Sequence, residues 1–369
     1  MIFIAISVLL YIAVWHQQST YFHSNSIQIS ETEGQQKLEN ISPTCNCNGR
    51  TTNLTKQQSF NPDAFQWCSS RSSQRGTHQN VIAYTVFGNV NERYYSLLTN
   101  ISSTAEKFYP GWIVRFYHNF SNQSEEAYRK LCNVYCQFNN VDLCSVPELI
   151  ERIRDTAKNK QVEPIEAGLL QHLNPRMYRY LVAFDPNVDI FISRDVDSMI
   201  WKREVDAVEQ WLQSNYTFHV MRDCIRHEVL MLAGPHFLFF ILNFYVHFDI
   251  LNGFFFLAGM WGAKLQQRRY LIEGLMRAII PVAQNQIKQT DQIVLKDIVW
   301  PTARFDVMLH DSYYCQNPAL MARTLPLRVY PFPTQRKDRH FVGDVGQHRL
   351  ADKCPRACRP PDHKDWEYC

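Results

Sequence analysis

The stretch that decides the fold is Val188-Asp-Ile-Phe-Ile-Ser-Arg-Asp-Val-Asp-Ser198, an apolar, β-prone run that stops at two carboxylates, Asp195 and Asp197. Side chains two residues apart in an extended chain point the same way. The two carboxylates can therefore close on one hard cation at the end of a buried strand, as suits a divalent metal that neutralises a diphosphate. A solvated loop at a strand end is the alternative interpretation.

Upstream of this strand, the chain is patterned as the start of a parallel sheet. Residues 81–87 form a compact apolar run closed by a glycine, and residues 94–108 have helical spacing. A Tyr-Pro-Gly break then precedes a second strand-like run at 112–117. A strand, helix and strand in this order predict a βαβ unit, whose sheet binds ligands at the carboxyl ends of its strands.

The same alternation continues on both sides of the Asp pair. A helix-like span at 163–180 leads into the central strand, and residues 203–212 place Val205, Val208, Trp211 and Leu212 on one helical stripe. Residues 218–221 are patterned as the next strand. The sequence therefore predicts an α/β fold with a sheet flanked by helices.

Length and composition limit the possible classes. The chain has 369 residues, 46% of them hydrophobic, so it can bury a large core, and we expect one catalytic domain with appendages. The net charge is +3, with no basic block, no zinc-finger spacing and no GxxxxGK[ST] loop. No nucleic-acid partner is expected.

The amino-terminal region predicts a membrane attachment. The first fifteen residues are apolar apart from Ser7, so residues 1–16 are interpreted as a signal anchor or a signal peptide. We favour the uncleaved anchor because no convincing small-x-small cleavage site follows. Residues 17–76 are rich in Ser, Thr, Asn and Gln, which is typical of a flexible stem.

Sequons and cysteines both indicate exposure to the lumen of the secretory pathway. Six N-x-[ST] sequons occur, at Asn40, Asn53, Asn100, Asn119, Asn122 and Asn215. The eleven cysteines predict a disulfide framework in which at least one is left over, and the spacing does not give the pairing. A zinc site from Cys354, Cys358 and His363 is the less favoured alternative.

Residues 235–259 do not fit the pattern of the surrounding chain. They are almost solidly Phe, Leu, Ile and Tyr, and Leu-Ala-Gly precedes the segment at 232–234 and ends it at 257–259. Removing the segment joins Gly234 to Met260 without a break. We interpret it as a retained intron, since a translated polypyrimidine tract has this composition. A second transmembrane helix is the alternative.

These features together resemble lumenal type II glycosyltransferases of the GT-A fold. The closest resemblance is to a group that carries five pieces in a fixed order. Here they are Arg194 to Ser198, Arg222 to His227, Gly259 to Gly262, Asp291-Gln292 and His310 to Ser312. The resemblance implies a Rossmann-like, mixed and mainly parallel sheet. It places the catalytic domain at 77–346, followed by a cysteine-containing tail at 347–369.

The resemblance also implies a metal and a donor. Asp197, and Asp195 directly or through water, would hold Mn²⁺ or Mg²⁺ against the diphosphate of a nucleotide sugar, with His310 completing the site. A structural histidine is the alternative for His310. The residues implied around the donor are Tyr84, Thr85, Arg179, Arg194, Gly259, Trp261 and Gly262. Core packing of Tyr84, surface roles for the arginines and an ordinary glycine turn are the alternatives.

Two carboxylates compete for the catalytic role. Asp291, as a general base or as the carboxylate beside the reacting carbon, could equally be a helix N-cap. Asp223 could equally form a buried ion network with Arg222 and His227. The sequence of residues 227–231 excludes a metalloprotease H-E-x-x-H site, because Met231 stands where the second histidine is required.

The resemblance therefore implies a metal-dependent glycosyltransferase that transfers a hexosyl or N-acetylhexosaminyl group from a nucleotide-diphosphate donor. The acceptor would be a hydroxyl of a lumenal glycan, glycoprotein or glycolipid. The enzyme would be a single-pass type II protein of the Golgi or endoplasmic reticulum membrane. A catalytically inactive GT-A-like lectin or chaperone is the first alternative, and a metal-dependent phosphohydrolase is the second.

Overall fold

The computed structural model describes residues 45, 47, 65–88, 92–120, 125–158, 165–225, 259–284, 287–315, 328–344 and 350–369. These residues belong to one unit, Pro43–Cys369. The predicted anchor and all of the inserted segment except Gly259 lie outside them. Within the described part of the chain, no helix is both long enough and apolar enough to cross a bilayer.

An eight-stranded sheet of order β3-β2-β1-β4-β6-β5-β7-β8 forms the centre of this unit. Neighbouring strands are parallel, except that β6 runs antiparallel to both β4 and β5. The prediction of a mixed, mainly parallel sheet is confirmed. The strands are β1 Gln79–Val86, β2 Ile113–His118, β3 Val141–Ser145, β4 Val188–Arg194, β5 Phe218–Arg222, β6 Met260–Lys264, β7 Val307–Asp311 and β8 Val329–Tyr330.

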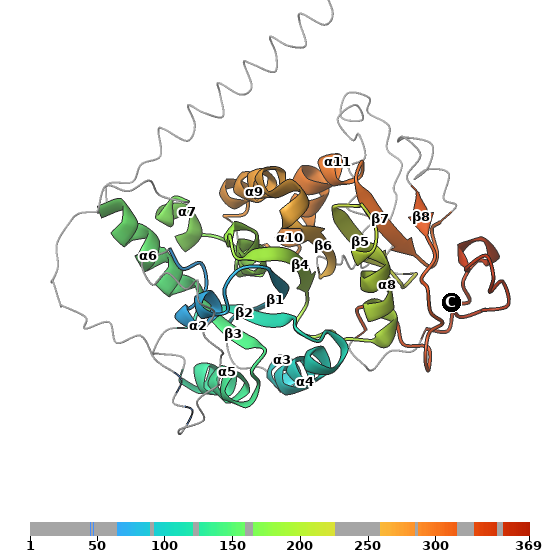
Figure 1. Cartoon of the computed structure of the whole chain (residues 1–369), viewed down its shortest axis with the longest axis horizontal. Helices are drawn as coiled ribbons and strands as arrows, with labels where there is room; N and C mark the ends of the chain where they lie inside the picture. Colours follow the sequence, from blue (N-terminus) through green and yellow to red (C-terminus); the bar gives the residue numbers. More distant parts are fainter. Residues whose placement is uncertain are drawn as a thin grey trace, which may run out of the picture. The chain divides into compact units, whose positions relative to one another are not determined.

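Helices cover both faces of the sheet, with α9 and α11 on one side and α4 and α5 on the other (Figure 1). Alternate residues of β1 join two separate apolar clusters, Val81 and Ala83 in one and Ile82 and Tyr84 in the other. Burial on both faces explains why β1 is a continuous apolar run. The helices are α2 Ser70–Gln74, α3 Glu92–Tyr95, α4 Leu98–Phe108, α5 Glu125–Gln137, α6 Val146–Lys158, α7 Ala167–Gln171, η1 Pro175–Phe184, α8 Lys202–Leu212, α9 Leu265–Val282, α10 Thr290–Val294, η3 Leu295–Val299, α11 Trp300–Ala303 and η4 Arg356–Cys358.

Two predicted elements differ from the structure. The helix expected at 163–180 is divided into α7 and the 3-10 helix η1, since the Asn174 side chain accepts a hydrogen bond from the Arg176 amide and Pro175 starts a new helix. Of the glycine turn expected at 259–262, Gly259 lies in a turn, and residues 260–262 are the start of strand β6. The predicted helix at 203–212 is confirmed as α8.

Folded structure begins before residue 76, where the predicted stem ends. Trp67 is buried and stacks on Phe184 at a centroid distance of 5.3 Å. Helix α2 follows, and Arg71 donates hydrogen bonds to the carbonyls of Tyr135 and Phe138. The polar composition that suggested a stem is therefore partly the composition of a surface segment that packs on the sheet.

Five disulfides confirm the predicted framework, and they attach cysteines of the predicted stem and tail to the rest of the described chain. Cys224 is the eleventh cysteine and lies buried outside these five pairs. The zinc alternative is wrong, because Cys354 and Cys358 belong to different disulfides. The pairs are Cys45–Cys132, Cys47–Cys136, Cys68–Cys144, Cys315–Cys358 and Cys354–Cys369.

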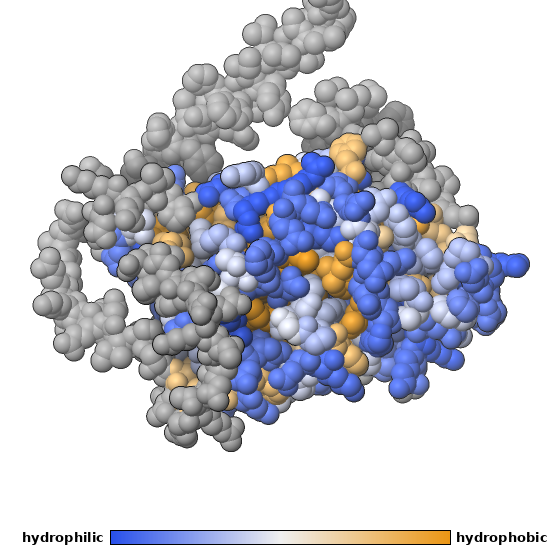
Figure 2. Space-filling model, viewed as in Figure 1, coloured by the Kyte–Doolittle hydropathy of each residue, from blue (hydrophilic) through white to orange (hydrophobic). Residues whose placement is uncertain are grey.

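The surface of the described residues is largely hydrophilic in the view of Figure 2. Most of the exposed large apolar side chains come from residues 270–305, which include helices α10 and α11 and most of α9. They are Tyr270, Leu271, Val282, Ile287, Ile293 and Phe305. Two of them, Ile287 and Ile293, flank the chain segment that forms one wall of the pocket described next.

Candidate functional site

The site lies where β1 and β4 end. These strands are parallel, so their carboxyl ends meet at one edge of the sheet. Strand β6 runs the other way, and its first residue, Met260, pairs with Arg194 at the end of β4. Reversal of one strand thus brings Gly259 beside Asp195, although the two are far apart in the sequence.

A pocket of about 540 Å³ opens at this edge. Pockets that bind small molecules commonly have volumes of this order. The end of β1, the loop after β4, helix η1 and the start of α10 all contribute side chains to it. The lining residues are Thr85, Val86, Phe87, Tyr94, Tyr95, Arg176, Arg179, Asp195, Val196, Asp197, Lys288, Gln289, Asp291 and Gln292.

Arg179 joins the two acidic walls of the pocket. One guanidinium nitrogen donates to Asp195 Oδ1 at 2.5 Å and to the Arg194 carbonyl at 2.9 Å. The other donates to Asp291 Oδ2 at 2.9 Å. The backbone amide of Arg179 donates to Thr85 Oγ1 at 3.0 Å, which attaches η1 to the end of β1. Two predicted site carboxylates are therefore held by one predicted site arginine.

The electrostatics of this group depend on burial. Burial lowers the pKa of Arg179, but the carboxylates of Asp195 and Asp291 outweigh it and leave that pKa raised. Burial raises the pKa of Asp291, and the Arg179 guanidinium partly opposes the shift. Asp291 lies in the first turn of α10, whose N-cap is Gln289, so the N-cap interpretation of Asp291 does not hold.

Gly259 leaves space for the Asp195 carboxylate. A Cβ atom at position 259 would collide with the side chain of Asp195 and would meet its backbone nitrogen at 2.5 Å. A residue without a Cβ is therefore required here. Removing residues 235–259 would place Gly234 directly before Met260, so both the continuous and the shortened sequence supply a glycine at this point.

Asp195 and Asp197 are the carboxylates of the pocket that could hold a cation together with a substrate. Within the described residues, no group of three or more His, Cys, Asp or Glu side chains is placed to hold a metal ion. Asp195, whose side chain is 36% exposed, and Asp197 both line the pocket. Mg²⁺ and similar hard cations are commonly held by one or two carboxylates together with substrate phosphates and water.

His310 does not lie with these carboxylates. It belongs to β7, which β6 and β5 separate from β4. Its ring nitrogens lie 2.8 Å from His219 Nε2 and 2.8 Å from Gln210 Oε1, and the residue is fully buried. Burial, reinforced by Arg203, lowers the pKa of His310 to about 3. The structure therefore places it as a neutral histidine of the core.

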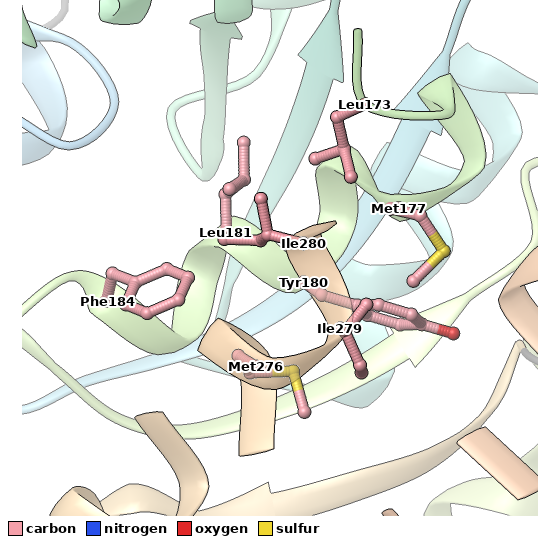
Figure 3. Close-up of a pocket in the computed structure, with 8 residues that line it drawn as sticks. All are labelled: Leu173, Met177, Tyr180, Leu181, Phe184, Met276, Ile279 and Ile280. Atoms are coloured by element: carbon pink, nitrogen blue, oxygen red, sulfur yellow. The ribbon is translucent and has the colours of Figure 1, made fainter. Parts of the chain in front are cut away.

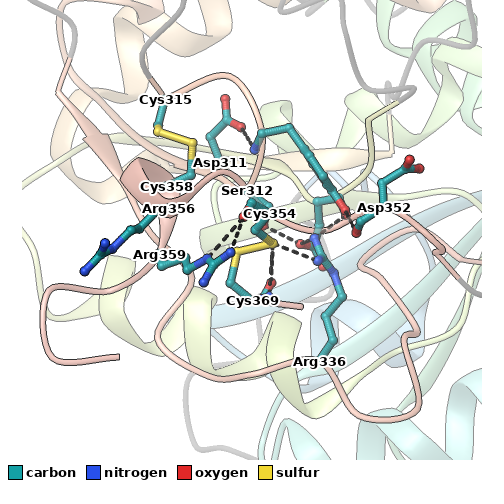
Figure 4. The surroundings of a disulfide bond; sticks show 12 residues. Asp311, Ser312, Cys315, Arg336, Asp352, Cys354, Arg356, Cys358, Arg359 and Cys369 are labelled. Atoms are coloured by element: carbon teal, nitrogen blue, oxygen red, sulfur yellow. Dashed lines mark hydrogen bonds and ion pairs between the residues drawn. A yellow bond between two sulfur atoms is a disulfide. The ribbon is translucent and has the colours of Figure 1, made fainter. Parts of the chain in front are cut away.

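Asp223 is also away from the pocket, in a buried ion network at the end of β5. Arg203 donates to both of its carboxylate oxygens, and Arg336 and Ser312 donate to Oδ1 at 2.5 and 2.6 Å. Burial raises the pKa of Asp223, but Arg203 and Arg336 outweigh it and hold that pKa at about 2. Arg336 also donates to Cys354 Sγ, so the network secures the carboxyl-terminal segment (Figure 4).

The remaining predicted donor residues support the pocket from behind. Arg194 is fully buried, forms an ion pair with Glu204 at 2.8 Å and donates to the carbonyls of Gly259 and Met199. Tyr84 packs against Phe116 in the core. Trp261 and Gly262 are buried in β6, where Trp261 contacts Tyr180 and Phe191 edge-on. None of these four predicted residues is among the side chains that line the pocket.

Residues near the carboxyl terminus brace the loop that carries the carboxylates. The Met199 amide donates to the Asp344 carbonyl at 2.9 Å, and the His340 ring stacks on Trp201 at 4.3 Å. The Asp344 side chain in turn lies 2.6 Å from His340 Nδ1. No local pattern in the sequence shows this contact, since its two sides are about 140 residues apart.

Several lining residues were missed by the sequence analysis. Phe87 and Tyr94 lie at and beyond the end of β1, and the Arg176 guanidinium lies 5.4 Å from the Phe87 ring. Lys288 and Gln289 immediately precede α10. Proximity to Arg179 and Asp291 in the sequence is the signal that could have identified Arg176, Lys288 and Gln289.

A second cavity, between η1 and α9, is a packing void. It measures about 10 Å³ and is lined only by apolar residues and Tyr180, among them Leu173, Met177 and Met276 (Figure 3). A cavity needs at least about 10–15 Å³ and polar partners to hold one water molecule. It is therefore too small and too apolar to bind a substrate.

Comparison with known proteins finds distant structural likeness only. No family model matches the chain, and no curated protein matches it. Galactosyltransferase LgtC in complex with donor and acceptor sugar analogs matches at 13% identity and a TM-score of 0.34, over 71% of this chain and 90% of that one. An active-site mutant of LgtC gives the same values. Apo mouse xyloside xylosyltransferase 1 matches at 9% identity and a TM-score of 0.29, over 65% of this chain and 86% of that one.

Proposed function

We propose that this protein is a metal-dependent glycosyltransferase of the GT-A type, which moves a sugar from a nucleotide-diphosphate donor to an acceptor hydroxyl. The observation that carries the proposal is the placement of Asp195, Asp197 and Asp291 around one pocket at the carboxyl ends of β1 and β4. The five sequence motifs imply the same reaction class by resemblance. Residues of two of them, the Asp pair and Asp291-Gln292, line the pocket together.

In this proposal, Asp197 and Asp195 hold Mn²⁺ or Mg²⁺. The cation would neutralise the negative charge of the departing diphosphate. Arg176 and Lys288 line the same pocket and supply further positive charge for phosphate oxygens. Thr85, Phe87 and Tyr94 form the wall at the end of β1, where the nucleoside would lie. The basic groups thus stabilise the leaving group in a partly enclosed site.

Asp291 is the proposed catalytic carboxylate. It is 5% exposed and lines the pocket, and burial raises its pKa. A carboxylate with a raised pKa accepts a proton more readily than an ordinary one. Asp291 would therefore take the proton from the acceptor hydroxyl, or stabilise positive charge on the sugar from the side. Asp223 is not proposed for this role because it lies away from the pocket, in a buried network with Arg203, Arg336 and Ser312.

The proposed location is the Golgi or endoplasmic reticulum, with the domain in the lumen and residues 1–16 as a signal anchor. The five disulfides support this proposal, because such bonds persist in oxidising compartments. The acceptor would then be a glycan, a glycoprotein or a glycolipid of the secretory pathway.

The test is a panel of nucleotide sugars, with release of the nucleoside diphosphate measured with and without Mn²⁺. At least one donor should release the diphosphate, and a chelator should stop the release. Hydrolysis to a nucleoside monophosphate and a sugar 1-phosphate instead would favour the phosphohydrolase. Sugar binding without any release, over the whole panel and with a set of acceptors, would favour the inactive lectin or chaperone.

A further inference from the structure

We infer that Arg179 is a positioning residue of the proposed transfer reaction, which holds the carboxylates of Asp195 and Asp291 in one frame instead of binding the donor diphosphate. The inference rests on the proposed function and gives Arg179 a role different from the donor contact expected from the sequence.

The guanidinium of Arg179 is committed to protein groups on both sides. Its two terminal nitrogens donate to Asp195, to the carbonyl of Arg194 and to Asp291, at 2.5, 2.9 and 2.9 Å. The residue is 3% exposed. A planar guanidinium makes several directed hydrogen bonds at once, so these contacts determine where both carboxylates lie. Little of the side chain remains available to a diphosphate.

The backbone of Arg179 is held as firmly as its side chain. Its amide donates to Thr85 Oγ1 at 3.0 Å, and η1 begins at a capped Asn174-Pro175 pair. Helix η1 also packs on β1, β4 and α9. The backbone of Arg179 is therefore held in place at the centre of the sheet edge. A fixed donor that contacts the end of β4 and the start of α10 links the proposed cation ligands to the proposed catalytic carboxylate.

On its other side, the Asp195 carboxylate lies close to the backbone at Gly259. The Asp195 carboxylate fits between the Arg179 guanidinium and the backbone at position 259, where a Cβ would collide with it. The carboxylate therefore has a protein neighbour on each side. The contacts of Arg179 with Asp195 and Asp291 together form a clamp on the two carboxylates. Catalysis depends on reacting groups held within fractions of an ångström, so loss of this clamp should slow the chemical step more than it weakens donor binding.

The test compares Arg179→Lys with Arg176→Lys. Lysine keeps the charge but cannot span two carboxylates. Arg179→Lys should lower kcat by about tenfold or more with donor KM changed less than about threefold. Arg176→Lys, on the same helix and in contact with the Phe87 ring, should chiefly raise donor KM. A raised donor KM with unchanged kcat for Arg179→Lys would overturn the inference.

A double-mutant cycle with Asp291→Asn identifies the partner. If Arg179 acts through Asp291, the effect of Arg179→Lys on kcat should shrink to about threefold or less in the Asp291→Asn background. Equal losses in both backgrounds would contradict this. Should Arg179→Lys fail to fold, Asp291→Glu displaces the same contact by one methylene group. It should lower kcat at unchanged donor KM, and the opposite pattern would count against the clamp.

Failure of the proposed function is recognised separately, because the wild-type protein would then turn over no nucleotide sugar. In that case the clamp is tested by urea unfolding of the wild type, Arg179→Lys, Asp291→Asn and the double variant. A strongly non-additive cycle between Arg179→Lys and Asp291→Asn supports the clamp, and an additive cycle overturns it.

Discussion

At the scale of single residues, the two carboxylates of the Asp-x-Asp pair have different surroundings. Asp195 is held by Arg179 on one side and by the backbone at Gly259 on the other. Asp197 lines the open pocket two residues further on. Both carboxylates therefore line the pocket, and Arg179 and the backbone at Gly259 contact Asp195. These contacts come from the fold and cannot be seen in the motif.

Asp197→Asn should lower the affinity for a nucleoside diphosphate in the presence of Mn²⁺ by about tenfold or more, because the substitution removes ligand charge. The fold should remain intact, since the position lies at the pocket surface. Calorimetric titration of the diphosphate, with and without Mn²⁺, measures the effect. Asp189→Asn, at the opposite end of β4 beside His78, is the matched control and should bind as the wild type does. Wild-type affinity in Asp197→Asn would remove the metal assignment.

At the scale of elements, strands β5 and β7 share a buried histidine pair. His219 and His310 are both fully buried, and His219 Nε2 lies 2.8 Å from His310 Nδ1. Burial lowers the pKa of His310 to about 3 and holds that of His219 well below its ordinary value. Both rings are therefore neutral in the folded chain at neutral pH. A histidine whose folded pKa is lowered stabilises the fold above its unfolded pKa, and this contribution is lost as the pH falls.

We expect the free energy of unfolding to fall as the pH drops from about 6.5 toward 3, by about 1.4 kcal/mol per pH unit for each buried histidine. Urea unfolding at several pH values measures the slope. His310→Gln should make the slope shallower, because one of the two groups no longer titrates. The control is His78→Gln, since the His78 side chain is 82% exposed. An unchanged slope in His310→Gln would show that the pair does not drive the pH dependence.

Gly262 allows strand β6 to lie between β4 and β5. A Cβ at position 262 would meet the Phe191 carbonyl oxygen at 2.7 Å and the Ile192 side chain at 2.8 Å. The strand can lie between β4 and β5 because these contacts are made to a bare backbone. Gly274, in helix α9, has no such close neighbours. An added Cβ at this position would meet nothing within 4 Å.

Gly262→Ala should therefore destabilise the fold by about 1–3 kcal/mol, as overpacking does. Gly274→Ala should stabilise it by about 0.5–1 kcal/mol, because alanine is the better helix former. Urea unfolding of the two variants beside the wild type gives both values. Equal effects at the two positions would contradict the close packing of β6.

At the scale of the whole molecule, disulfides join the two ends of the described chain to the sheet. Cys45, Cys47 and Cys68 attach the amino-terminal residues to α5 and β3, and Cys315–Cys358 attaches the carboxyl-terminal segment near β7. These bonds and the exposed side chains of Asn100 and Asn215 are consistent with the proposed lumenal location.

Expressed in a eukaryotic host, the protein should run faster on a gel after treatment with an N-glycosidase, because its six sequons would carry glycans. Asn100→Gln and Asn215→Gln should each remove one step of the shift, since both asparagines are exposed in the structure. Matched Asn139→Gln and Asn187→Gln variants, which lie outside sequons, should leave the shift unchanged. No shift at all in the wild-type protein would contradict the lumenal location.

The sequence by itself determined the parts of this protein that depend on neighbours in the chain. The runs that became β1, β2, β4 and β5 show their strands directly, because burial on both faces leaves a continuous apolar pattern. The Asp pair could be placed at a strand end for the same reason. Asp291 and Arg179 were also recognised as site residues, although their contact was not.

Only the tertiary structure decided which of the candidates lie together. His310, Asp223, Arg194 and Tyr84 carry the residue types that a site would need, yet each is buried among partners supplied by distant segments. The reversal of β6 brings Gly259 to Asp195, and η1 carries Arg179 between two walls of the pocket. Contacts of this kind depend on strand order and helix packing, which join residues dozens to more than a hundred positions apart and leave no local pattern in the sequence.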